Sequence, residues 1–162
     1  MAQVNLFNES IFEHNDGLNV LFDQYKLYVE LTDKASERRN NVNTFFLSIN
    51  SILVTGITII VSQINSNPGN SWWILIATLS GMIFCVTWRR LIISYGRVNA
   101  ARYKIIHLIE TKLPVNLFNY EWKILTEDKD YNPFSKTEGL IPLIFLFMYI
   151  VVSIIVLIEI FI

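Results

Sequence analysis

The chain has 162 residues, of which 52% are hydrophobic, 14% aromatic and only 17% charged, and its mean hydropathy is +0.40. This composition excludes an ordinary soluble globular domain and places the chain in a lipid bilayer. The formal net charge of -1 indicates neither nucleic acid nor an acidic partner. A single cysteine, Cys85, excludes an intramolecular disulfide.

Residues 1–16 form a polar, acidic tail. They carry no basic residue, so they do not resemble a cleaved signal peptide, and we expect the first span to direct membrane insertion.

Residues 17–41 predict a cytoplasmic amphipathic helix. Asn15 or Asp16 is a plausible N-cap, and Glu30 stands four residues before Lys34, the spacing of a helical ion pair. Nothing stronger than Asn40 and Asn41 breaks the pattern, so the helix should run into the first span. Apolar residues and one threonine recur at helical spacing: Leu18, Leu21, Phe22, Tyr25, Tyr28, Val29 and Thr32.

Three apolar segments predict transmembrane helices, at 42–64, 72–88 and 140–162. A helix of about 20 apolar residues crosses the roughly 30 Å hydrocarbon core. Residues 65–71 between the first two spans are uncharged and rich in turn formers, which predicts an external loop. The second span opens on two tryptophans and ends on two arginines, residues typical of membrane interfaces.

Basic residues fix the predicted topology. All 13 Lys and Arg residues lie in two blocks, 26–39 and 89–136, and none lies in the loop at 65–71 or after the third span. Short loops rich in basic residues stay in the cytoplasm. We therefore expect a cytoplasmic N-terminus and an external C-terminus.

The second cytoplasmic segment, 89–139, predicts a further helical region. An apolar seam extends the second span until Pro114, and a short helix is expected around 118–125. Two such helices would pack as a thin stalk with apolar stripes left uncovered, which favours a ring of protomers. The seam comprises Trp88, Leu91, Tyr95, Val98, Arg102, Ile105, Ile109 and Leu113.

The third span is preceded by a helix-start signal. Ser135 and Glu138 have the spacing of a capping box, which predicts that the helix begins there, at the membrane surface. Pro142 fits less well, since it would remove an interior backbone hydrogen bond, so a kink or a separate interfacial turn is expected.

Several blocks together resemble the RipA family of small bacterial inner-membrane proteins described as octameric. The resemblance covers about residues 25 to 142 and implies an octamer at the bacterial inner membrane; the biochemical activity of that family is poorly defined. The blocks are 25–30 (YKLYVE) with Asp33 and Arg38–Arg39, 43–50 (NTFFLSIN), 88–92 (WRRLI) with Ser94–Tyr95, 106–110 (IHLIE) with Leu113–Pro114, Glu121–Trp122, and 131–135 (YNPFS).

Candidate chemistry is sparse. His107 and Glu110 could give two metal ligands, but a site needs three or four, and the other histidine is His14 in the tail. A helix-surface polar pair is the preferred interpretation. Carboxylates at residues 30, 33 and 37 alternate with basic residues, as an ion-pair face does, and this is preferred to acid/base catalysis. We expect no enzyme, catalytic set, metal or cofactor.

A stripe of hydroxyl groups, Ser51, Thr55, Thr58 and Ser62, lies on one face of the first span. With Asn50 it could line an aqueous pathway. Small residues also let membrane helices approach closely, and Gly56 and Gly81 suit that use, so packing is preferred.

The sequence thus predicts an all-α integral membrane protein with three transmembrane helices, the first two extended into a cytoplasmic stalk, assembling into a ring. Its preferred function is a non-enzymatic scaffold whose cytoplasmic crown binds an unidentified protein, with the Glu121–Trp122 helix and the acidic loop after it as candidate contacts; its partners are the lipid bilayer and its own copies, with no nucleic acid. The alternative is an oligomeric channel or permeability effector lined by the first span. The predicted segments are 1–16, 17–41, 42–64, 65–71, 72–88, 89–139 and 140–162.

Overall fold

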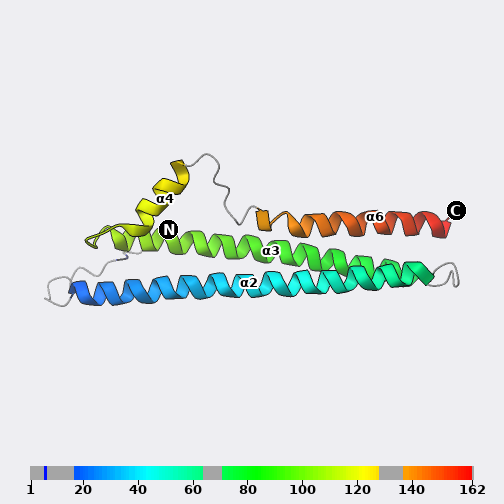
Figure 1. Cartoon of the computed structure of the whole chain (residues 1–162), viewed down its shortest axis with the longest axis horizontal. Coiled ribbons are helices and arrows are strands. Elements are labelled where there is room, and N and C mark those ends of the chain that lie inside the picture. Colours follow the sequence, from blue (N-terminus) through cyan, green and yellow to red (C-terminus); the bar gives the residue numbers. More distant parts are fainter. Residues whose placement is uncertain (1–5, 7–16, 64–70, 128–136, 162) are drawn as a thin grey trace. The chain divides into compact units, whose positions relative to one another are not determined.

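A computed structural model describes residues 6, 17–63, 71–127 and 137–161. Every secondary-structure element in these ranges is a helix (Figure 1): α2 (Gly17–Gln63), α3 (Ser71–Glu110), α4 (Leu117–Glu127) and α6 (Ile141–Phe161). Helices α2, α3 and α6 are long and apolar enough to cross a membrane. The predicted all-α fold with three spans is confirmed. The proposed N-cap, the external loop at 65–70, the acidic loop from 128 and Ser135 lie outside the described residues.

The helices form two compact units. Among the described residues, one unit, here called the polar unit, contains 17–36 and 98–127; the other, here called the membrane unit, contains 37–63, 71–97 and 137–161. Helices α2 and α3 each pass through both units without a break. Asn40 and Asn41 do not interrupt α2, as predicted. Asparagine has a moderate cost in a helix, and packing of the flanking turns overcomes it.

The membrane unit is a three-helix bundle. Ile57 of α2, Ile74 and Cys85 of α3, and Tyr149 and Val156 of α6 form its main core. A second cluster lies at the end of the uncharged stretch, where Trp88 stacks on Phe46 with ring centroids 5.9 Å apart. Most other large apolar side chains of the three helices are exposed, as expected for helices that face lipid or further copies of the chain.

The polar unit packs α4 against the paired ends of α2 and α3. Leu21 and Tyr25 of α2 contact Ile106 and Ile109 of α3, and Phe118 of α4 packs against this cluster. The arginine side chain at position 102 donates a hydrogen bond from Nη1 to the Leu31 carbonyl oxygen at 2.9 Å. This bond crosses from α3 to α2 and helps to fix their register.

The predicted apolar seam of α3 is partly wrong in its register. Trp88 and Ile109 are buried as expected, whereas Val98 is exposed. Ile92 and Ile106, which the predicted seam omits, are buried instead. A strict alternation of three- and four-residue steps drifts around a straight helix of 3.6 residues per turn, so a pattern read over seven turns loses its phase.

The third span begins at Ile141, within one residue of its predicted start at 140. Thr137 and Glu138 are helical, a turn at 139–140 follows them, and α6 begins at Ile141. The Leu140 amide donates to the Thr137 carbonyl at 3.1 Å across this turn. The expected separate turn before the span is therefore present. Pro142 is the second residue of α6, where a backbone amide has no helical partner. It therefore removes no interior hydrogen bond.

Helix α3 ends a few residues before its predicted stop at Pro114. Helix α3 ends at Glu110, and bonds from the amides of Lys112 and Leu113 close the last turns. The short helix predicted around 118–125 is confirmed as α4.

Candidate functional site

Helix α4 is held in place by one buried carboxylate. Glu110, the last residue of α3, accepts hydrogen bonds from the Tyr25 hydroxyl at 2.9 Å, the Phe118 amide at 2.9 Å and the Asn119 amide at 3.0 Å. These amides belong to the second and third residues of α4, which lack helical partners. Glu110 thus serves as a distant N-cap, and its negative charge suits the helix N-terminus.

This arrangement corrects the interpretation of His107 and Glu110 as a surface polar pair. Glu110 is fully buried, and its carboxylate oxygens face α2 and α4. His107 is half-buried and lies beside the ring of Tyr103, with centroids 6.5 Å apart. Among the described residues, no group of three His, Cys, Asp or Glu side chains could hold a metal ion.

The anchor also changes the acidity of Tyr25. Burial, then the hydrogen bond to Glu110 and its negative charge, raise the pKa of Tyr25 from 10.0 to about 12. The ring of Tyr25 meets that of Phe118 edge-on at 6.4 Å. Polar and aromatic contacts therefore attach the same end of α4.

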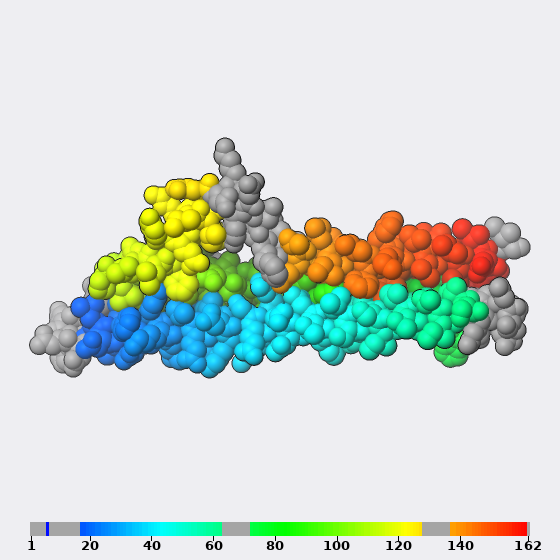
Figure 2. Space-filling model, in the orientation of Figure 1, coloured from blue at the N-terminus to red at the C-terminus, as the bar shows by residue number. Residues whose placement is uncertain are grey.

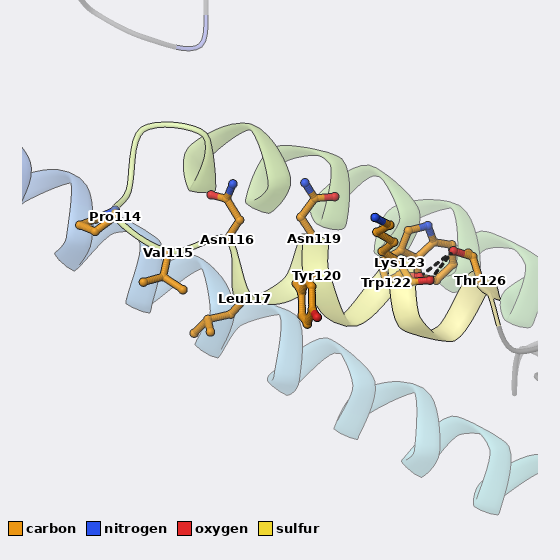
Figure 3. A pocket seen from close by; sticks show the side chains of 9 residues that line it. All are labelled: Pro114, Val115, Asn116, Leu117, Asn119, Tyr120, Trp122, Lys123 and Thr126. Atoms are coloured by element: carbon orange, nitrogen blue, oxygen red, sulfur yellow. Dashed lines mark hydrogen bonds between the residues drawn. The ribbon is translucent and has the colours of Figure 1, made fainter.

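The rest of α4 is exposed rather than buried. The helix has no buried residue, and Leu117, Tyr120, Trp122 and Ile124 are each at least half exposed. A groove of about 650 Å³ lies along this helix. Figure 3 labels the side chains that line it. In Figure 2, α4, in yellow, lies at the surface. The groove is lined by Pro114, Val115, Asn116, Leu117, Asn119, Tyr120, Trp122, Lys123 and Thr126.

The groove combines apolar and basic character. Val115, Leu117 and Tyr120 supply exposed apolar surface, and Lys123 supplies a positive charge with no ion-pair partner among the described residues. Exposed apolar side chains gathered on one helix are typical of a surface that binds a protein or a membrane. We call this groove, with Trp122 and Ile124, the α4 face.

Within the predicted row of charges on α2, Glu30 and Lys34 form the ion pair expected from their spacing. Lys34 lies 2.7 Å from Glu30, and that hydrogen bond and charge lower the pKa of the Glu30 carboxyl. A different pair was not foreseen, because it joins residues 99 positions apart. Arg39 Nε lies 3.6 Å from Glu138 Oε2, and both side chains are mostly buried.

A polar cluster joins the three helices of the membrane unit. Asn50 is buried and donates from Nδ2 to the Phe46 carbonyl at 2.8 Å. Its Oδ1 accepts bonds from the Tyr149 hydroxyl at 3.0 Å and from Cys85 Sγ at 3.4 Å. Asn50 therefore belongs to the core of the bundle. The alternative in which Asn50 lines an aqueous pathway together with the hydroxyl stripe does not hold, because adjacent residues on a helix point about 100° apart.

The hydroxyl stripe itself lies on the exposed side of α2. Ser51, Thr55, Thr58 and Ser62 are all exposed, and each donates to a backbone carbonyl three or four residues earlier, at 2.7 to 2.9 Å. A Cβ at Gly56, beside the stripe, would meet nothing within 4 Å inside the protomer. This face is therefore open to whatever surrounds the protomer.

Sequence reasoning missed Tyr149 and Ser153 of α6. Ser153 donates to Thr78 at 2.7 Å, and Tyr149 reaches Asn50. These two residues are four positions apart in an otherwise apolar helix, and that spacing could have indicated an inward polar face.

The sequence model of the octameric membrane protein family (8xMP) matches residues 22–158, well over half of the chain. The chain belongs to this family. It is therefore a membrane protein, which agrees with its three apolar helices and with the family resemblance of its sequence blocks. No match is found among the curated proteins or among the solved structures. The matched residues include α3, α4 and the Glu110 anchor, so the candidate site lies within the family's common region.

Proposed function

We propose that the chain is the protomer of a non-enzymatic scaffold in a bacterial inner membrane. Eight copies form a ring, and their polar units make a cytoplasmic crown. The α4 face binds a partner protein. The family's octameric description supports the assembly, and the basic blocks at 26–39 and 89–136 support the cytoplasmic placement of the polar unit.

The observation that carries the proposal is the contrast between the two ends of α4. Its first turn is fixed by Glu110 and Phe118, whereas the rest of the helix buries no residue. A rigidly held helix with an exposed apolar face loses little entropy when it binds. An apolar helix with nothing to bind would expose its side chains to water at a cost of about 25 cal/mol per Å².

The chemistry of the face specifies its occupant. Leu117 and Tyr120 offer an apolar floor, and Lys123 offers one cation. A segment with apolar side chains and a carboxylate opposite Lys123 would complement this surface. The Glu121–Trp122 turn remains a candidate contact, since Trp122 is half exposed and lines the groove.

The alternative function is a channel lined by the hydroxyl stripe. The exposed position of Thr55 and Thr58 favours it, because an exposed stripe of four hydroxyls can face a lumen in a ring. Each hydroxyl hydrogen is already donated to the helix backbone, so these side chains need no water. This point favours close packing between protomers.

A photo-crosslinking residue placed at Tyr120 tests the scaffold in living cells. We expect an adduct whose mass is not a multiple of the protomer mass, because the α4 face should contact another protein. The same residue at Glu30, exposed on α2 in the polar unit, serves as the control. Adducts made only of protomers would place α4 at the contact between copies and contradict the proposed partner site.

Bilayer recordings separate the scaffold from the channel. The purified oligomer should give no single-channel current in a planar bilayer. Reproducible currents that change when Thr55 is replaced, with the oligomer intact, would establish the channel and refute the scaffold.

A further inference from the structure

A hydrogen bond fixes the register of α2 and α3 where the uncharged stretch ends. Trp88 Nε1 donates to Asn43 Oδ1 at 2.9 Å, and Trp88 also stacks on Phe46. The two helices are antiparallel, so residues before Asn43 lie at the level of residues after Trp88 (Figure 1). At 1.5 Å per residue, Arg38 and Arg89 both lie within about 8 Å, along the helix axis, of this Trp–Asn pair.

Arginines gather at this level from both helices. The Arg39 side chain is mostly buried, and its Nε lies 3.6 Å from Glu138 Oε2. Arg38, Arg89 and Arg90 are exposed, and none has an ion-pair partner in the described ranges of the chain. We call these three exposed residues the arginine girdle.

The local balance of charge is strongly positive. At this end of the membrane unit the described residues include five arginines, at positions 38, 39, 89, 90 and 97, and two carboxylates, at 37 and 138. The two carboxylates leave three positive charges without compensation. One of the carboxylates, Glu138, is already committed to Arg39.

Apolar side chains lie on the membrane side of the girdle. Phe45 of α2 and Val86 of α3 are exposed a few residues inside it. A molecule with an anionic headgroup and apolar chains could therefore place its headgroup at the arginines and its chains along the apolar surface. Guanidinium groups bind phosphate oxygens in pairs of hydrogen bonds, which favours arginine over lysine at such a site.

We propose that the arginine girdle is a binding site for phospholipids with a net negative headgroup. The guanidinium groups bind the phosphodiester oxygens. They favour a headgroup that carries a second negative charge, or one that lacks a cationic group to compensate the phosphate. The acyl chains lie along the exposed apolar surface below it. This assignment is independent of the proposed partner site on α4, because it uses residues of the membrane unit alone.

Lipid retention by the purified oligomer tests the assignment. Phosphatidylglycerol and phosphatidylcholine with identical acyl chains are added in mild detergent, and bound lipids are counted by native mass spectrometry. Arg89→Gln combined with Arg90→Gln removes two charges from the girdle. Lys26→Gln combined with Lys104→Gln removes two exposed charges from the polar unit and is the matched control.

The wild-type oligomer and the control should retain phosphatidylglycerol in preference to phosphatidylcholine. The Arg89/Arg90 variant should bind phosphatidylglycerol roughly 25-fold more weakly, about fivefold for each basic residue near an anionic surface. Equal retention of the two lipids by the wild-type oligomer would overturn the proposal, whether or not the variant folds. Displacement of the lipid by excess inorganic phosphate would show a free-anion site and also overturn it.

Discussion

The ring of Tyr149 lies directly against Gly81. A Cβ atom built at Gly81 would come within 2.5 Å of the Tyr149 ring, closer than any real contact of that kind. The same tyrosine donates its hydroxyl to Asn50, so its ring is fixed between α3 and α2. Gly81 therefore admits the side chain that attaches α6 to the other two helices. The expected use of Gly81 for close helix packing is confirmed within the protomer.

Gly81→Ala should destabilise the membrane unit. The added methyl group forces Tyr149 away from Asn50, and overpacking of this kind costs about 1–3 kcal/mol. Gly96→Ala is the control, because a Cβ there meets nothing within 4 Å and alanine favours a helix by up to ~1 kcal/mol. Thermal unfolding in detergent should give a lower midpoint for Gly81→Ala only. Equal midpoints would mean that the tyrosine can move aside freely.

Glu110→Ala should release α4. The change leaves the Tyr25 hydroxyl and two amides without their acceptor, at a cost of about 1–3 kcal/mol. Amide hydrogen exchange in 117–127 should become faster by at least tenfold. Glu121→Ala removes an exposed carboxylate on α4 and should change the amide exchange little. Unchanged protection in Glu110→Ala would show that Phe118 packing alone holds α4.

The polar unit should lose stability in alkali because of Tyr25. Its pKa is about 12 in the folded chain and 10.0 without the burial and the Glu110 interaction. Below pH 10 both states are neutral and stability is unaffected. From about pH 10 to 12 the unfolded chain ionises first, so stability falls as the pH rises.

Chemical denaturation across this pH range measures the loss. Tyr25→Phe should show a smaller decline between pH 10 and 12 than the wild type. Tyr120→Phe removes an exposed hydroxyl of the same unit and should follow the wild-type curve. If Tyr25→Phe declines as steeply as the wild type, another group accounts for the alkaline loss.

A larger side chain on the face of α2 that carries the hydroxyl stripe should weaken the octamer. Thr55→Leu or Gly56→Leu pushes neighbouring helices apart, at roughly 1 kcal/mol per contact. Thr87→Leu, an exposed threonine on α3 with the same backbone hydrogen bond, is the matched control. Native mass spectrometry should find smaller assemblies for the α2 variants. Intact octamers in both sets would remove the hydroxyl face from the interface.

Reporter fusions test the orientation. A reporter active only outside the cytoplasm should be active after Ile162 or inserted at Asn67, and inactive before Met1. This pattern follows from the absence of basic residues at the first two sites. Activity at Met1 would reverse the topology and move the polar unit outside.

The sequence alone determined the three spans, the continuity of α2 and the short helix α4. These features depend on composition and on periodicity over many residues, and both can be read locally. The apolar stretches are long enough to cross a bilayer whatever their neighbours are. The Glu30–Lys34 pair was predictable for the same reason, because four residues on one helix fix its geometry.

Only the tertiary structure decided the roles of Glu110, Asn50 and Arg39. Glu110 and Asn50 accept hydrogen bonds from residues of other helices, Tyr25 and Tyr149. Arg39 forms an ion pair with Glu138, far away in the sequence, at 3.6 Å and without a hydrogen bond. A buried polar side chain costs free energy unless it finds a partner, and that partner depends on how the helices align. Spacing along one helix specifies which face a residue occupies, but not what that face meets.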